Sequence, residues 1–180
     1  MHRITASLCL LLFLFASPTI AIAQGAPRKA CAVDADLPSV PACALEIRHG
    51  QQRVIATYLP PLLASTRHHL IAAFLPTGWS YINRHGLVVV THVAVMDNGA
   101  NDFHYGLVRV TRDGKWGLAD THGRLVVPLK YDGMLDYQSD KGWEVCTGCR
   151  AVPDGEHGWF EGGAWQSLDQ NGRPRLSRSR

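Results

Sequence analysis

The sequence predicts an all-β protein made of tandem antiparallel β-hairpin repeats of about 37 residues, and it leaves room for one short helix near residues 61–69. Three observations predict this fold class. An eight-residue pattern recurs without a gap, as WSYINRHG at 79–86, WGLADTHG at 116–123 and WQSLDQNG at 165–172. Valine-rich runs follow the first two copies. Segments of equal length, 70–79 and 107–116, lead into the first two tryptophans.

The eight-residue pattern predicts a strand that runs into a tight turn. The residue four positions after the tryptophan is Asn83, Asp120 or Asp169. Such a side chain accepts hydrogen bonds from the backbone of a turn. The glycine three residues later, Gly86, Gly123 or Gly172, takes the positive φ that other residues resist. Each unit is therefore expected to be strand, tight turn and strand.

A partial unit precedes the three copies. GQQRVIATY at 50–58 matches GRLVVPLKY at 123–131 in length, with glycine first and tyrosine last. The dipeptide His-Gly recurs at 49–50, 85–86 and 122–123. Repeats in a line would space these histidines apart, so we expect solvated turn residues, not a shared metal site.

Residues 60–75 alone could be read as a helix opened by two prolines. The alignment between copies assigns Leu70 to Phe74 to a strand instead. It leaves room for a short helix between Pro61 and His69.

The middle unit, GKWGLADTHGRLVVPLKY at 114–131, resembles the WG-repeat family, which occurs mainly in bacteria. DNG at 97–99, Phe103 and GLVR at 106–109 fit the same resemblance, which covers roughly residues 45–175. The first and last copies lack the glycine after the tryptophan. The resemblance implies a β-rich repeat architecture and says little about activity.

Trp79, Trp116 and Trp165 hold the same place in each unit. We expect each to pack against the neighbouring hairpin and to bury a large apolar area. The functional alternative is a row of exposed aromatic platforms for sugars or peptides. Gly86, Gly123 and Gly172 complete the set of expected structural residues.

The first 24 residues have the pattern of a secretory signal peptide. Arg3 is followed by an apolar run from Leu8 to Phe15, and AIA at 21–23 precedes Gln24. The run is short for a membrane span, so we expect a periplasmic or secreted protein without one. The expected organisation is signal peptide 1–24, flexible leader 25–42, repeat domain 43–176 and frayed tail 177–180.

The charge balance gives no argument for a nucleic-acid partner, and none is expected. The chain has 18 basic and 15 acidic residues. Loss of Arg3 with the signal leaves 17 − 15, or a net charge of +2.

Loss of Cys9 with the signal leaves an even number of cysteines, as expected in an oxidising compartment. Proximity favours the pairs Cys31–Cys43 and Cys146–Cys149 without fixing them.

The last unit departs from the pattern. Nine positions separate Leu70 from Trp79, but twenty-two separate Trp143 from Trp165, a gain of thirteen. We expect an enlarged loop there, with CTGC at 146–149, DGEH at 154–157 and a Gly-rich run to Gly163. Loops on rigid scaffolds often carry function. Its candidate binding residues are Asp154, Glu156, His157 and Trp159.

Four hypotheses compete for the CTGC motif at 146–149. The favoured one is a local structural disulfide. The second is a zinc site of Cys146, Cys149 and His157, with Asp154 or Glu156 as the fourth ligand. The third is a redox-active pair, for which the sequence lacks a thioredoxin-like βαβ context. In the fourth, both cysteines bond to Cys31 and Cys43.

No catalytic residue is assigned, since the sequence has no nucleotide-binding glycine loop, HExxH motif or nucleophile elbow. We therefore expect a non-enzymatic exported binding or scaffold protein of the bacterial cell envelope, without a cofactor. Its expected partner is another envelope protein or a cell-wall component. The alternative is a metal- or thiol-dependent enzyme, or a zinc-binding module, centred on Cys146, Cys149 and His157.

Overall fold

In each repeat the chain reverses direction at a turn that contains the polar residue and the glycine of the eight-residue pattern. The computed structural model describes residues 40–64, 69–96, 99–154 and 157–175. All of them belong to one unit, 31–180. The expected signal peptide, the leader up to residue 39 and the tail 177–180 lie outside the described residues.

The first hairpin is the partial unit. After the 3-10 turn η1 (Ala42–Ala44), β1 (Leu45–Arg48) pairs antiparallel with β2 (Gln51–Val54). His49 and Gly50 connect them with φ of 53° and 75°. Two positive φ values in a two-residue loop match the twist of a hairpin. The partial unit therefore has a turn at the His-Gly dipeptide 49–50.

The short helix begins earlier than expected. The 3-10 turn η2 (Ala56–Tyr58) leads into α1 (Leu59–Ala64), where the sequence predicted a helix near 61–69. Prolines fit a first helical turn because its N–H groups have no partner within the helix. Leu59 and Leu62 are buried. No helix in the described part of the chain has the length and apolar character of a membrane span.

The second unit is a three-stranded antiparallel sheet. It consists of β3 (Leu70–Leu75), β4 (Gly78–Asn83) and β5 (Val88–Val90), in that order. The strand predicted from Leu70 to Phe74 is confirmed. The two-residue strands β6 (Val95–Met96) and β7 (Gly99–Ala100) form a small hairpin after it.

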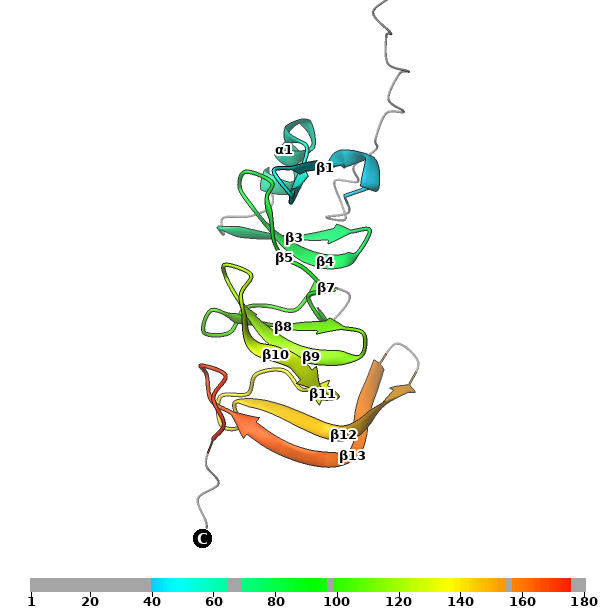
Figure 1. The fold of residues 1–180 in the computed structure, drawn as a ribbon, viewed down its shortest axis with the longest axis vertical. Coiled ribbons are helices and arrows are strands. Elements are labelled where there is room, and N and C mark those ends of the chain that lie inside the picture. Colours follow the sequence, from blue (N-terminus) through cyan, green and yellow to red (C-terminus); the bar gives the residue numbers. More distant parts are fainter. Residues whose placement is uncertain (1–39, 65–68, 97–98, 155–156, 176–180) are drawn as a thin grey trace, which may run out of the picture. The chain divides into compact units, whose positions relative to one another are not determined.

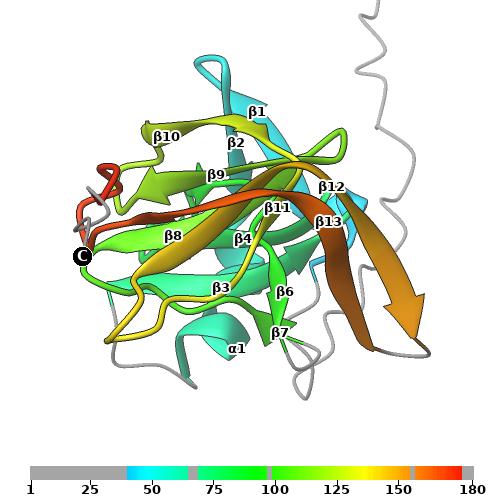
Figure 2. The same ribbon diagram turned by 90° about the horizontal axis from the view of Figure 1, so that it is seen from below.

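The third unit repeats this arrangement, and the fourth extends it. β8 (Leu107–Arg112), β9 (Lys115–Asp120) and β10 (Leu125–Tyr131) form the third sheet. β11 (Gly133–Met134), β12 (Trp143–Asp154) and β13 (His157–Leu168) form the fourth. The sheets follow one another in chain order (Figure 1), and β3, β8 and β12 overlap in projection when seen from below (Figure 2). The described residues thus form the all-β tandem repeat that the sequence predicted.

The repeated turns have the predicted chemistry. The carboxamide Oδ1 of Asn83 accepts hydrogen bonds from the backbone N–H groups two and four residues on, at 2.9 and 3.0 Å. Asp120 does the same at 2.8 and 3.0 Å, and Asp169 at 2.8 and 2.9 Å. The three turn glycines have φ of 78°, 79° and 78°.

These bonds hold the turn carboxylates in their charged form. The backbone N–H of Arg173 is the main cause that lowers the pKa of Asp169. Burial raises the pKa of Asp120, but hydrogen bonds from Arg124 and from the backbone of His122 outweigh it, so that this pKa is also lowered. The charge therefore persists in the folded turns at neutral pH.

Each apolar core is shared between two successive units. The first cluster joins the β1–β2 hairpin and α1 to β3 and β4, with Val40 and Ala44 already inside it. The second joins β4 and β5 to β8 and β9. The third joins the sheet β8–β10 to the sheet β11–β13. Neighbouring repeats thus supply the burial that a single hairpin lacks.

The turn glycines also set how closely the repeats approach. A Cβ on Gly86 would lie 2.7 Å from the carbonyl oxygen of Val54 in the preceding unit. A Cβ on Gly123 would overlap the carbonyl oxygen of Val89, and one on Gly172 would lie 2.8 Å from Val127 Cγ2. These glycines are therefore needed for close packing as well as for positive φ.

Candidate functional site

The enlarged segment of the last unit is a hairpin, and the prediction of an enlarged loop is wrong. β12 and β13 have 12 residues each and pair in one register from Trp143↔Leu168 to Asp154↔His157. The corresponding strands β8 and β9 have six each. The glycines that suggested a loop instead mark a bend within two paired strands.

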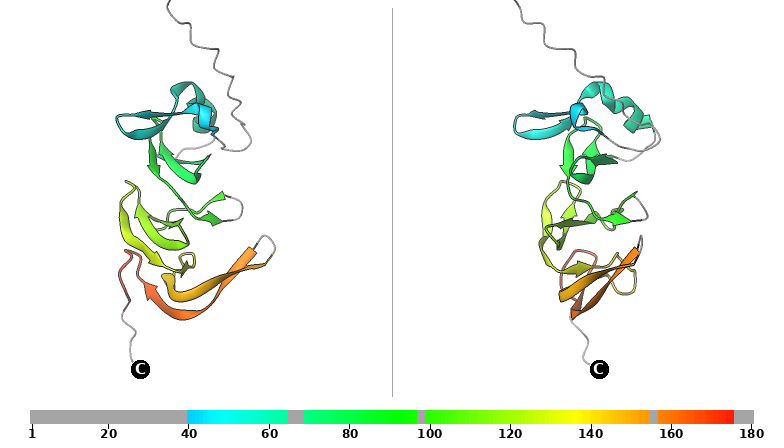
Figure 3. Two further views of the ribbon diagram at one scale, coloured as in Figure 1. Left: turned by 45° about the vertical axis from the view of Figure 1, so that its right-hand side comes forward. Right: turned by 90° about the vertical axis from the view of Figure 1, so that its right-hand side faces the viewer.

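The hairpin bends where three glycines adopt positive φ. Gly148 on β12 has φ 75°, and Gly162 and Gly163 on β13 have φ 72° and 75°. Beyond this point the outer half leaves the direction of the sheet (Figures 1 and 3). A Cβ on Gly163 would lie 2.5 Å from the backbone nitrogen of Cys149, so the bend leaves no space for a side chain.

A disulfide spans the bend. Cys146 and Cys149 are bonded, with their Cα atoms 6.0 Å apart. Three residues of straight strand would separate those atoms by about 10 Å, so the bond requires the bent backbone. The favoured hypothesis of a local disulfide is confirmed. Cys31 and the side chain of Cys43 lie outside the described residues.

Asp132 ties the bend to the third unit. One carboxylate oxygen accepts a hydrogen bond from the backbone N–H of Gly148 at 2.7 Å, and the other lies 2.5 Å from Lys115 Nζ. The hydrogen bond from Lys115, with that from Gly148, lowers the pKa of Asp132. The charged carboxylate therefore joins the β8–β9 turn to the inner side of the bend.

Aromatic contacts bring the outer half back against the repeats. The Phe160 ring lies edge-on to Trp116 and Trp165, with centroids 5.7 and 6.3 Å apart. A Cβ on Gly133 would lie 2.6 Å from the Phe160 ring. The outer strands are thus supported on one side by packed side chains.

The repeat tryptophans do not share one environment. Trp79 and Trp116 are half-buried and pack against apolar clusters, as the structural hypothesis expected. Trp165 is 40% exposed, and Trp159, on the outer half, is 48% exposed. Next to Trp159, Arg150 and Glu161 form an ion pair of 2.6 Å across the two strands. Both exposed tryptophans therefore lie on the enlarged hairpin, whereas Trp79 and Trp116 are half-buried and Trp143 is fully buried.

Two of the other candidate residues, Asp154 and His157, lie at the ends of β12 and β13. Asp154 is exposed and pairs in register with His157. Glu156 and the side chain of His157 lie outside the described residues. Within the described residues, no three His, Cys, Asp or Glu side chains group as a metal would require. The zinc alternative needs both cysteines as thiolates, whereas the structure holds them as a disulfide.

Sequence reasoning missed a polar cluster around Arg109, which is 8% exposed in the middle of β8. Its Nε donates to Asn101 Oδ1 at 3.1 Å, and another guanidinium nitrogen donates to the carbonyl oxygen of Met134 at 3.0 Å. Asp136 lies 3.5 Å from the guanidinium and accepts from Asn101 at 3.1 Å. His104 Nε2 lies 3.6 Å from the other Asp136 oxygen.

This cluster joins segments that are distant in the sequence. Burial lowers the pKa of Arg109, and the charge of Asp136 opposes this effect. Buried cations are retained where they are paired and hydrogen-bonded. Its polar groups contact one another, which favours a role in fixing the segment 101–104 to the last unit. The one sequence signal was a charged residue inside the apolar run LVRV at 107–110.

A family model matches part of the chain. Residues 116–143, from Trp116 in β9 through β10 and β11 to Trp143, match the family model described as WG containing repeat. Comparison with curated proteins and with solved structures finds no match. The match covers the unit in which the sequence resemblance was closest. Residues 116–143 of this chain are therefore similar to the WG containing repeat.

Proposed function

We propose that this protein is a non-enzymatic, exported binding protein of the bacterial cell envelope. It recognises another envelope protein or a cell-wall component through the outer half of the β12–β13 hairpin. The observation that carries the proposal is the exposure of two tryptophans on a hairpin that extends beyond what repeat stacking requires. Trp159 in the outer half is 48% exposed, and Trp165 on the inner side of the bend is 40% exposed.

Physical arguments favour this hairpin over the rest of the surface. Tryptophan is among the residues that most often dominate binding energy at interfaces. The bend is held by a disulfide and by the Asp132 contacts, so little conformational entropy is lost when a partner binds. The nearby Arg150–Glu161 pair offers polar contacts at the rim of the exposed ring.

Two observations support export: the bonded cysteine pair and the N-terminal sequence. A bonded cysteine pair is typical of oxidising compartments outside the cytosol. The apolar N-terminal run, with Arg3 before it and small residues after it, is typical of a secretory signal. We propose a periplasmic or secreted location on these grounds.

Photocrosslinking in the native envelope tests the binding surface. A photoreactive phenylalanine analogue replaces Trp159 in one variant and Phe74 in the control. Phe74 is a matched aromatic position, 46% exposed on β3 in the second unit. We expect a discrete crosslinked product from position 159 and none from position 74. Equal products from both positions, or none from position 159, would remove the hairpin as the recognition surface.

A binding measurement separates the tryptophan side chain from the hairpin backbone. With purified cell-wall sacculi or the crosslinked protein as the probe, Trp159→Ala is expected to weaken binding by about tenfold or more. The Phe74→Ala control is expected to bind as the parent protein does. Both side chains are substantially exposed, so thermal unfolding should report little change in stability. Unchanged binding by Trp159→Ala would contradict the proposal.

A further inference from the structure

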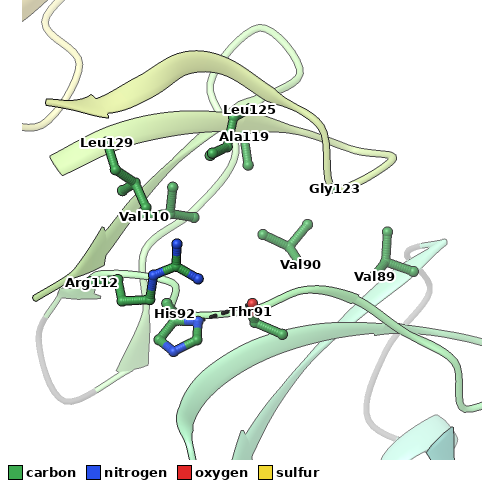
Figure 4. A pocket seen from close by; sticks show the side chains of 10 residues that line it. All are labelled: Val89, Val90, Thr91, His92, Val110, Arg112, Ala119, Gly123, Leu125 and Leu129. Carbon is green, nitrogen blue, oxygen red and sulfur yellow. Dashed lines mark hydrogen bonds between the residues drawn. The ribbon is translucent and has the colours of Figure 1, made fainter. Parts of the chain in front are cut away.

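A hollow lies between the second and third repeats, on elements that do not include the β12–β13 hairpin. It is lined by residues of β5, β8, β9 and β10 and of the segment that follows β5 (Figure 4). Its volume is about 180 Å³. Drug-sized ligands occupy pockets of about 300–1,000 Å³, so this one admits only a smaller molecule.

Six of its ten lining residues are aliphatic. Val90 and Val110 form the inner surface and are 2% and 3% exposed, whereas Leu125 at the rim is 50% exposed. Leu129 is half-buried beside Val110. An aliphatic group that enters the hollow would therefore leave water for contact with these aliphatic side chains.

The polar side of the hollow carries positive charge. The guanidinium of Arg112 lies between Val110 and the ring of His92 (Figure 4). None of the ten lining residues is acidic. Asp113 lies 3.9 Å from Arg112 Nε, but its side chain is 93% exposed and solvated. Such a weak surface pair leaves the guanidinium able to bind a second carboxylate.

We propose that this inter-repeat hollow binds a small aliphatic carboxylate. The carboxylate bonds to Arg112, and the chain of about four to six carbons packs against Val90, Val110 and Leu129. This site is independent of the proposed recognition by the hairpin. Either can fail while the other holds.

A chain-length series tests the apolar wall. Butanoate, pentanoate and hexanoate are titrated into the full-length mature protein, and amide and methyl shifts are recorded by NMR. We expect saturable shifts at Val90, Val110 and Ala119, with affinity that rises about two- to fourfold per added methylene. For hexanoate, a Kd of about 1 mM is expected for so small a ligand. Shifts that do not saturate by about 20 mM, or an affinity that does not change with chain length, would overturn the proposal.

Charge variants test the polar side. Arg112→Gln is expected to weaken hexanoate binding by about tenfold. The control Arg150→Gln alters an exposed arginine outside the hollow and is expected to bind as the parent does. Hexylamine, with the opposite charge, is expected not to bind. The NMR spectra themselves report that each variant is folded. Equal binding of hexanoate by the parent and Arg112→Gln, or equal binding of hexylamine and hexanoate, would exclude this site.

Discussion

Gly123→Ala is expected to lower the free energy of unfolding by about 2–5 kcal/mol, since it combines an unfavourable backbone conformation with overpacking. Gly123 has φ 79°, which L side chains rarely adopt. Its Cβ would also overlap the carbonyl oxygen of Val89 in the preceding repeat. Relief of that overlap would require the third repeat to move away from the second and open their shared core. Urea unfolding followed by tryptophan fluorescence measures the loss.

Gly114→Ala is the matched control. Gly114 has a similar φ of 72° in the β8–β9 turn, but a Cβ there would meet no atom within 4 Å. Only the conformational cost remains, about 1–2 kcal/mol. The difference in free energy of unfolding between the two variants therefore measures the cost of the overlap between a Cβ at position 123 and the preceding repeat. Equal losses would mean that Gly123 supplies positive φ alone, which would contradict the packing role assigned to it.

Arg109→Ala is expected to lower the free energy of unfolding by about 2–4 kcal/mol, because the groups that it contacts lose their partner in a buried setting. Asn101 Oδ1 and the carbonyl oxygen of Met134 would lose their donor, and Asp136 would lose its nearest cation. The guanidinium also lies 5.8 Å from the centre of the Trp116 ring, a further contact that alanine removes. The same urea unfolding experiment measures this loss.

Arg112→Ala provides the comparison on the same strand. Its side chain is 58% exposed and is paired only weakly with the solvated Asp113. Its removal is expected to change stability by no more than about 0.5 kcal/mol. Similar stabilities for the Arg109 and Arg112 variants would show that the Arg109 contacts add nothing to the fold.

The turns of this protein were predictable because their determinants are local. An acceptor side chain and a glycine three residues later define the same geometry wherever they occur, and Asp120 and Asp169 show it with the same two hydrogen bonds. The strand from Leu70 was predictable through its equivalence to the strand from Leu107. The helix was placed too late, since the prolines begin it at Leu59.

The enlarged hairpin was missed because the sequence pattern does not distinguish a bend from a loop. Gly148, Gly162 and Gly163 are turn-formers by composition. Here they lie within two strands that keep their register on both sides of the bend. Pairing of this kind depends on partners across the hairpin, which local propensity does not reveal.

The Arg109 cluster was missed for a related reason. Asn101 and Asp136 are 35 positions apart and meet only when the third and fourth units pack. Their sequence neighbours give no sign of this contact. Arg109 inside an apolar strand was the one local indication of a buried ion pair.

Intact mass and peptide mapping without reduction, on protein purified from the envelope of its own cells, test the central claim most directly. That claim is an exported binding protein whose recognition hairpin is held bent by a disulfide. It predicts a mature chain without residues 1–24, a peptide with Cys146 bonded to Cys149, and no bound metal. Free thiols at both positions with one bound zinc ion would contradict it, and would place the chemistry of this protein at the zinc site instead.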